Sequence, residues 1–232
     1  MTVLQSGPIT ALYAGTIAPL GERAAPSAIR KAPAPAPWRI EIDGLVGDSH
    51  GDPSVHGGPE KALHHYPAEH YFAWMADEPS LERALTRQAA FGENLSPTGL
   101  TEDNVCLGDI FRLGGVRLQV SQGRQPCWKL NAHFARDDLA LRVQRTGRTG
   151  WYYRVLETGE VLPGERLQLI ERPQPAWPLS RVIRLLFQRM LDRSELEALA
   201  SIPEVAEGWR RLAQRRLQTG MVEDWSTRLG KN

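Results

Sequence analysis

The residue best suited to chemistry in this sequence is Cys127. It lies in a polar, turn-forming stretch with Arg124 and Lys129 close by. Cationic neighbours favour the thiolate, which is the form that attacks electrophiles and binds soft metals. The commoner role of a lone cysteine is a small buried side chain, and Cys106, in an apolar stretch, fits that role better. Spacing alone leaves a reactive and a structural Cys127 equally open.

A second candidate feature is the glycine-containing segment 55–61, which reads Val-His-Gly-Gly-Pro-Glu-Lys. Gly57 and Gly58 expose backbone N–H groups, and Lys61 follows at the start of an expected helix. This arrangement suits an anion, most often phosphate. Its spacing does not match the P-loop, which excludes a standard nucleotide site. A thiolate combined with an anion-binding segment predicts a cofactor that carries both a metal and a phosphate.

The histidines leave two other kinds of site open. Five of them could supply the base of a papain-like Cys–His mechanism, and no spacing selects one: His56, His64, His65, His70 and His133. Oxygen and nitrogen donors also alternate through Asp48, His50, Asp52 and His56. That pattern would allow a zinc or hard-metal site, although a hydrogen-bonded loop is the commoner role of such a stretch.

Composition limits the classes of function. The 232 residues include 28 basic and 27 acidic side chains, for a formal charge of +1. This balance excludes binding of nucleic acid or membranes that is driven by the charge of the whole chain. No stretch approaches the roughly 18 apolar residues of a spanning helix, and the N-terminus does not read as a signal peptide. With only two cysteines the chain is not a secreted disulfide scaffold. We therefore expect a cytoplasmic protein.

Strands are the main elements expected to position these residues. The pattern of apolar residues predicts strands at 12–17, 38–45, 105–107, 110–113, 116–122, 150–156 and 165–170. Two short helices separated by Pro67 are expected within 60–77, with others at 80–90 and from Trp128. The segment 21–37 is rich in alanine and proline. It is expected to be a surface loop, or else an extended segment lying along a pocket.

From Pro173 onward the pattern becomes helical. Helices are expected from Ser180 to about Met190, from Asp192 or Ser194, and from Pro203 to Gly220. We therefore predict two domains, residues 1–172 and 173–232, the second being a small three-helix module. Arginines cluster on its last helix, but a solvated helix face is the commoner explanation, so no nucleic-acid partner is expected.

Several runs of sequence, in order along about residues 10–172, together resemble the MOSC domain, which is named after the C-terminal domain of molybdenum cofactor sulfurases. The matching runs are 44–48, 55–63, 65–71, 91–95, 99–100, 108–109, 120–130 and 146–152. The C-terminal helices resemble the three-helix appendage of the YiiM-like branch. The resemblance implies a mainly β fold with α, in which a MOSC-type β-barrel core carries the small C-terminal module.

The resemblance also implies a cofactor and roles for particular residues. The cofactor is the molybdenum cofactor, Mo-molybdopterin, with Cys127 as the protein thiolate on the metal. Arg124 and Lys129 would hold negative charge near it. Gly57, Gly58 and Lys61 would bind the pterin or its phosphate. His56 and Asn94 would orient cofactor or substrate.

The implied activity is reduction of small N-hydroxylated compounds such as hydroxylaminopurine-type base analogues, with N–OH replaced by N–H and water released. A separate reductase would supply electrons, because the chain has neither a GxGxxG fingerprint nor a CxxC iron–sulfur pattern. The resemblance is compatible with a homodimer. Two alternatives stay open: a non-catalytic carrier of cofactor or persulfide sulfur on Cys127, and a thiol-dependent hydrolase. Two departures from the family pattern, Ser49-His50-Gly51 and Gly123, predict an altered substrate preference and a looser Cys127 loop respectively.

Overall fold

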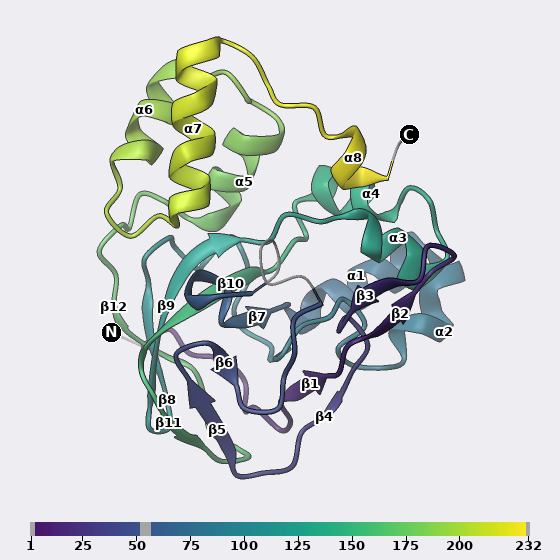
Figure 1. The fold of residues 1–232 in the computed structure, drawn as a ribbon. Coiled ribbons are helices and arrows are strands. Elements are labelled where there is room, and N and C mark those ends of the chain that lie inside the picture. Colours follow the sequence, from purple (N-terminus) through teal and green to yellow (C-terminus); the bar gives the residue numbers. More distant parts are fainter. Residues whose placement is uncertain (1–2, 52–56, 231–232) are drawn as a thin grey trace.

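A computed structural model describes residues 3–51 and 57–230 and shows a mixed α/β fold (Figure 1). Its centre is an antiparallel five-stranded sheet with the order β12-β8-β9-β10-β7. The strands are β7 (Leu63–His65), β8 (Ile110–Leu113), β9 (Val116–Gly123), β10 (Trp151–Glu157) and β12 (Gln168–Glu171). The long strand β9 ends just before Arg124 and Cys127, so it carries the chain directly to the candidate site.

Smaller sheets surround this centre. They are β1 (Tyr13–Gly15) with β4 (Lys31–Pro33), β2 (Ala18–Leu20) with β3 (Ala25–Ser27), and β5 (Trp38–Glu41) between β6 (Gly44–Leu45) and β11 (Gly159–Val161). The predicted alternation in β5 is confirmed, since Trp38 and Ile40 are buried and the residues between and after them are exposed. Across the described ranges these are four separate hydrogen-bonded sheets, so the expected closed barrel is not confirmed.

The segment 21–37 is not simply a loop. It contains β3 and β4, which pair with the two strands that precede it in the chain. Proline lacks a backbone donor and is tolerated in short edge strands. The alternative expectation, an extended segment, is therefore the correct one.

Short helices cover one part of the sheet. One of the helices predicted for this region does not form. The helices are η1 (Pro59–Lys61), α1 (Ala68–Asp77), η2 (Pro79–Leu81), α2 (Glu82–Leu85), α3 (Trp128–Phe134) and α4 (Leu139–Thr146). Two helices were expected across 60–77, but residues 63–65 form β7, whose three side chains are all buried. Its hydrogen bonding to β10 outweighs a local helical preference. Helix α4 was not expected.

The C-terminal helices are α5 (Leu179–Phe187), α6 (Arg193–Ser201) and α7 (Glu207–Thr219), which confirms three helices in this region. Asp192 caps α6 by accepting a hydrogen bond from Glu195 N at 3.2 Å, and Gly220 ends α7 in the left-handed conformation. The starts of α5 and α7 differ from expectation, because Pro178 and Ala206 hold the N-cap positions. No helix among the described residues is long and apolar enough to cross a membrane.

Gly123 marks the place where these helices pack on the sheet. It is the last residue of β9 and pairs with Trp151. A Cβ atom added at Gly123 would lie 2.9 Å from Cη2 of Trp209, which is 2% exposed, and 3.5 Å from Cγ1 of Ile183. The indole of Trp209 has no room to move aside. The position of Gly123 therefore permits close packing of α5 and α7, and the looser Cys127 loop that we expected from it stays a prediction.

The chain does not end with the three helices. Residues 221–230, here called the return segment, contain a short helix α8 (Ser226–Leu229) that lies beside α3 and α4 (Figure 1). Asn131 Nδ2 donates to Leu229 O at 3.0 Å, and Arg228 Nη1 donates to Pro126 O at 2.6 Å. The return segment therefore leaves the helical module and contacts the loop that carries Cys127.

Candidate functional site

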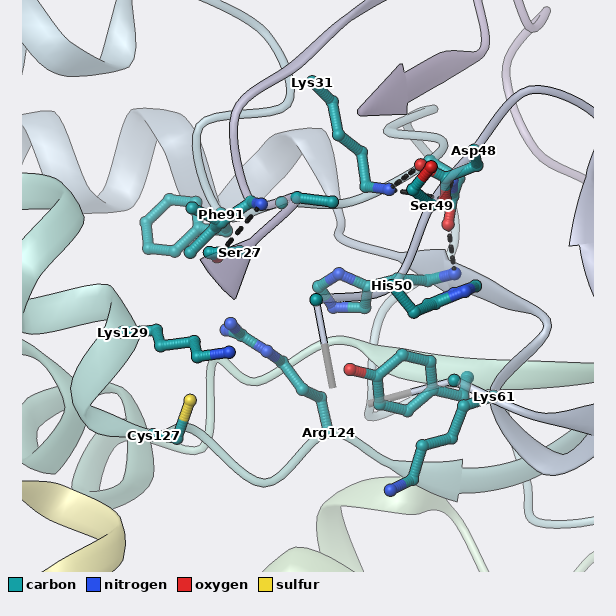
Figure 2. A pocket seen from close by; sticks show the side chains of 18 residues that line it. Ser27, Lys31, Asp48, Ser49, His50, Lys61, Phe91, Arg124, Cys127 and Lys129 are labelled. Atoms are coloured by element: carbon teal, nitrogen blue, oxygen red, sulfur yellow. Dashed lines mark hydrogen bonds and ion pairs between the residues drawn. The ribbon is translucent and has the colours of Figure 1, made fainter. Parts of the chain in front are cut away.

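Within the described residues, a cavity of about 90 Å³ brings together most of the predicted site residues (Figure 2). This thiol cavity is lined by Gly57, Lys61, Asn94, Arg124, Cys127 and Lys129 from the prediction, and by further residues of segments 27–31, 48–51, 64, 91–92 and 152. Gly58 adjoins the lining, and His56 lies outside the described residues. Residues separated by about a hundred positions in the sequence thus meet at one place.

Cys127 and Cys106 occupy opposite environments. Cys127 is half-buried, lines the cavity, and is the N-cap residue of α3, where its carbonyl accepts from Leu130 N at 2.9 Å. Cys106 is 3% exposed, and burial raises the pKa of its thiol to about 11. The thiol suited to chemistry is therefore Cys127, whereas Cys106 is a core residue as its sequence context predicted.

Arg124 brings a positive charge into the cavity without a carboxylate partner among the described residues. Arg124 is only 6% exposed, and its Nη1 atom makes no hydrogen bond to any described residue. Its backbone is fixed, since Arg124 N donates to Gly150 O at 2.9 Å and Gly150 N donates to Glu102 Oε1 at 2.7 Å. A buried guanidinium is costly unless it is paired. This orphaned donor indicates that the cavity is built for an anionic ligand.

Lys31 and Asp48 lie across the thiol cavity from Cys127 (Figure 2), and together with Asn94 they form a buried network. The Lys31 ammonium pairs with the Asp48 carboxylate, and these side chains are 7% and 1% exposed. Asp48 also accepts from Asn94 Nδ2 at 2.7 Å, while Asn94 Oδ1 accepts from His64 N at 2.9 Å. The amide of Asn94 therefore holds three segments together, and its predicted contact with a ligand stays a prediction.

Two further lysines complete the cationic lining. Lys129 Nζ donates to Pro26 O at 2.8 Å, which ties α3 to the extended segment that contains β3. Burial lowers the pKa of Lys61, and the charge of Cys127 opposes that shift. With Lys31 and Arg124, the part of the lining that the structure describes has four basic side chains and one carboxylate, that of Asp48. The surplus positive charge favours a ligand that carries phosphate.

Gly57 adds a close approach of backbone to the cavity. Its φ is +119°, and a Cβ atom there would lie 2.7 Å from Cγ of His50. Any larger residue would therefore be strained in its backbone and would collide with the His50 ring. Gly57 lines the cavity, and the predicted binding of an anion by its backbone N–H stays a prediction.

Comparison with known proteins agrees with this geometry. The model of the MOSC domain matches residues 52–168, and that of the YiiM-like, 3-alpha helix domain matches residues 177–220. Over 204 residues, 88% of the chain, the sequence is 41% identical to protein YiiM of Escherichia coli (strain K12), 90% of which is covered. The chain belongs to the MOSC domain family. Its place is in the YiiM-like branch.

Other relatives support the same assignment to the MOSC family. The crystal structure of YiiM from Escherichia coli superposes with a TM-score of 0.82 at 35% identity, covering 97% of this chain and 98% of that one. YiiM from Geobacillus stearothermophilus gives 0.75 at 32% identity, with 90% and 98% covered. A protein of Gibberella moniliformis named Reductase is 41% identical over 76% of this chain, which spans only 31% of that protein.

MOSC domains in general are associated with binding of the molybdenum cofactor, and the residues of the thiol cavity fit such a group. Cys127 offers a soft donor, which suits a thiophilic metal. The orphaned Arg124 Nη1 and the cationic surplus suit a pterin phosphate. The thiol of Cys127 and basic side chains occur in one cavity, and a cofactor with both a metal and a phosphate needs both kinds of group.

The histidines of this MOSC chain fall into two groups, those that line the thiol cavity and those that do not. Of the described ones, His50 and His64 line the thiol cavity. Burial lowers the pKa of His50, and burial followed by the charge of Arg124 lowers that of His64 well below its ordinary value, so the His64 ring is neutral. His65 instead stacks on Trp151, and Nε2 of His70 forms a hydrogen bond with Oε2 of Glu102 at 2.7 Å. Both lie outside the lining, as does His133. No cluster of three metal-ligating side chains occurs in the described ranges, and the proposed ligands Asp52 and His56 lie outside them.

Several lining residues of the MOSC site were not predicted. Among them are Ser27, Lys31 and Tyr152, of which only Tyr152 belongs to a motif singled out for its resemblance, whereas His64 had been named only as a possible catalytic base. Lys31 follows alanines and prolines in a segment without periodicity, so nothing in its spacing indicates a ligand. The available signal was the alternative that this extended segment lies along a pocket, and the structure bears that alternative out.

Glu93, in the turn 91–95, makes the stability of the fold depend on pH. It is fully buried, accepts from Tyr71 and from Phe91 N, and burial raises the pKa of its carboxyl from 4.5 to about 7, against the hydrogen bond from Tyr71. Between pH about 4.5 and about 7 the folded chain therefore holds a proton that the unfolded chain has released. The free energy of unfolding should fall as pH rises through that window and then level off.

Replacing Glu93 with glutamine should remove this slope, because the amide does not titrate. Urea unfolding at pH 5, 6, 7 and 8 is the measurement. The stability of Glu93→Gln relative to the unchanged chain should rise from pH 5 to pH 7 and stay constant above. The exposed Glu207→Gln serves as the control. Parallel pH curves for Glu93→Gln and the unchanged chain would contradict the assignment.

Proposed function

We propose that this MOSC protein is a molybdenum-cofactor-dependent reductase of small N-hydroxylated compounds, such as hydroxylaminopurine-type base analogues. The observation that carries the proposal is the half-buried thiol of Cys127 in a cavity whose buried Arg124 has no carboxylate partner among the described residues. Membership of the MOSC family and a relative named Reductase support an oxidoreductase.

The chain's own residues would hold the cofactor and leave its chemistry to the metal. Cys127 would bind the molybdenum, while Lys61, Arg124 and Lys129 would neutralise its anionic groups. The backbone at Gly57 and Gly58 would accept the phosphate, and His56 is proposed to orient cofactor or substrate. When bound, the cofactor supplies a two-electron couple that takes up an oxygen atom from the substrate.

The overall reaction consumes two electrons and two protons for each N–OH group. The N–O bond breaks, one proton goes to the nitrogen, and the other goes to the departing hydroxyl group, which leaves as water. A separate reductase is proposed as the electron donor, and the cytoplasm as the place where both proteins act. A homodimer remains part of the proposal.

Metal analysis of the full chain tests the proposal. The protein is purified from a host that makes the cofactor, and molybdenum per chain is measured by mass spectrometry. We expect close to one molybdenum per chain and reduction of an N-hydroxylated substrate with an artificial electron donor. A chain without molybdenum under these conditions refutes the proposal. A chain that binds molybdenum but reduces nothing indicates the alternative function, a cofactor carrier.

A further inference from the structure

The return segment reaches the loop that carries Cys127 through one side chain, Arg228. The guanidinium of Arg228 donates from Nη1 to Pro126 O and from Nη2 to Gln144 Oε1, each at 2.6 Å. Pro126 directly precedes Cys127 in the chain, and Gln144 lies on α4 and is only 2% exposed. Arg228 therefore links this loop to a buried side chain of a neighbouring helix.

An arginine suits such a link, because its N–H groups form a planar fork with fixed angles. Once Gln144 holds one side of the guanidinium, the direction of the other side is set as well. The rings of Phe187 and Trp225 restrict the side chain further, since the centroid of each lies 5.8 Å from Cζ of Arg228. The donor that reaches Pro126 O is therefore held in place before it meets the loop.

The oxygen that Arg228 holds belongs to the peptide group between Pro126 and Cys127. A peptide group is planar, so holding its oxygen also restrains the backbone nitrogen and Cα of Cys127. On the other side of that Cα, the Cys127 carbonyl accepts from Leu130 N at 2.9 Å. Both peptide groups that flank Cys127 are thus held, and together they direct the Cα–Cβ bond that carries the thiol.

The return segment is anchored on both sides of Arg228. Before it, Glu223 pairs with the fully buried side chain of Arg216 at 2.7 Å, which ties the segment to α7. After it, Leu229 is 4% exposed, and its carbonyl accepts from Asn131 Nδ2 of α3 at 3.0 Å. Arg228 therefore projects from a fixed backbone and not from a free end.

We propose that Arg228 is a positioning residue for Cys127, which holds the preceding peptide group so that the thiol keeps one direction in the thiol cavity. Groups that orient a metal ligand contribute about 10- to 100-fold to metal affinity or activity. The three-helix module, which anchors the return segment, thereby acts on the site although the described lining of the thiol cavity comes from residues 27–152. The inference deepens the reductase proposal, and the role of the thiol as a metal ligand rests on that proposal.

Amide hydrogen exchange of the full chain without cofactor is the first test, read from the masses of proteolytic fragments. In Arg228→Met, exchange within residues 124–130 should be about tenfold faster or more, because the hydrogen bond from a charged donor is lost. Exchange in strands β8 and β9 should not change. Arg211→Met is the control, since the Arg211 side chain on α7 is 72% exposed, and its exchange should equal that of the unchanged chain.

Gln144→Met is the second variant, and it replaces Arg228→Met if that chain does not fold. Gln144 does not line the described part of the thiol cavity, so its effect on the Cys127 loop has to pass through Arg228. Exchange within residues 124–130 should again become faster. The double variant should exchange no faster than Arg228→Met alone, because both changes remove the same link. Additive effects of the two changes would overturn the inference.

Turnover with molybdenum bound separates positioning from stability. At equal molybdenum content, kcat for an N-hydroxylated substrate should fall about tenfold in Arg228→Met, with KM unchanged. A residue that only stabilises the fold would leave kcat per folded chain as it is. Unchanged exchange within residues 124–130, or unchanged kcat per bound molybdenum, overturns the inference. A chain that shows the expected exchange but never binds molybdenum refutes the reductase proposal and leaves Arg228 as the residue that positions Cys127.

Discussion

Cys127→Ala is expected to lower the reduction of N-hydroxylated substrates by about 100-fold or more, since even changes beside a metal ligand cost about 10- to 100-fold. Its free energy of unfolding should stay within about 1 kcal/mol of the unchanged chain, because Cys127 is half-buried at the edge of a cavity. Steady-state reduction with an artificial donor and urea unfolding measure the two effects.

Cys106→Ser is the matched control for this substitution. It changes the other thiol, which is 3% exposed and whose nearest polar contact is Pro175 O at 3.8 Å. The hydroxyl would be buried with a poor partner, so stability should fall by about 1–3 kcal/mol while activity per folded molecule is retained. Unchanged reduction by Cys127→Ala, or lost molybdenum in a stable Cys106→Ser, would reverse the roles of the two cysteines.

Removing the carboxylate of Glu223 is expected to have the largest effect on stability. The Arg216 side chain is fully buried, and its guanidinium pairs with Glu223 at 2.7 Å while also donating to Leu186 O at 2.9 Å. Glu223→Gln leaves a buried charge without its counter-ion, which costs about 3 kcal/mol or more. Thermal and urea unfolding should show this loss clearly.

Glu207→Gln on α7 is the comparison for this prediction. Glu207 pairs with Arg210 and Arg211, but its side chain is 61% exposed. Exposed pairs contribute about 1 kcal/mol or less, so this variant should be nearly as stable as the unchanged chain. Similar losses in both variants would show that the Arg216–Glu223 pair is no more important than a surface pair.

The parts of the fold that follow from local periodicity were predictable. Helices α5 to α7 and strands β5, β8 and β9 have clear apolar patterns, and the family resemblance located the runs that line the site. Strand β7 was missed because Leu-His-His is buried on all three positions, so no alternation distinguishes it from a helix. Its conformation depends on pairing with β10, some ninety residues later.

For the candidate site too, features with a local sequence signal were predictable and long-range contacts were not. The polar and basic flanks of Cys127 distinguished it from Cys106. The structure agrees with this prediction, since Cys106 is buried and Cys127 is half-buried beside a cavity. The Lys31–Asp48 pair was not predictable, because Lys31 lies in the short strand β4, which has no apolar periodicity, and Asp48 lies in a turn 17 residues later. The same holds for the contact of Arg228 with Pro126, which joins positions 102 residues apart. Contacts of this range leave no pattern in the neighbouring sequence.

The contact between the return segment and the Cys127 loop has a consequence for the order of events in synthesis. A chain emerges from the ribosome N-terminus first, so the helices that cover Gly123 and the segment that contains Arg228 are made after Cys127. The Cys127 loop is therefore made before the segment that contacts it, and the hydrogen bond from Arg228 to Pro126 forms only once residue 228 has been made. The final position of the Cys127 loop is consequently set only after residues 27–152, which supply the lining of the thiol cavity, have been made.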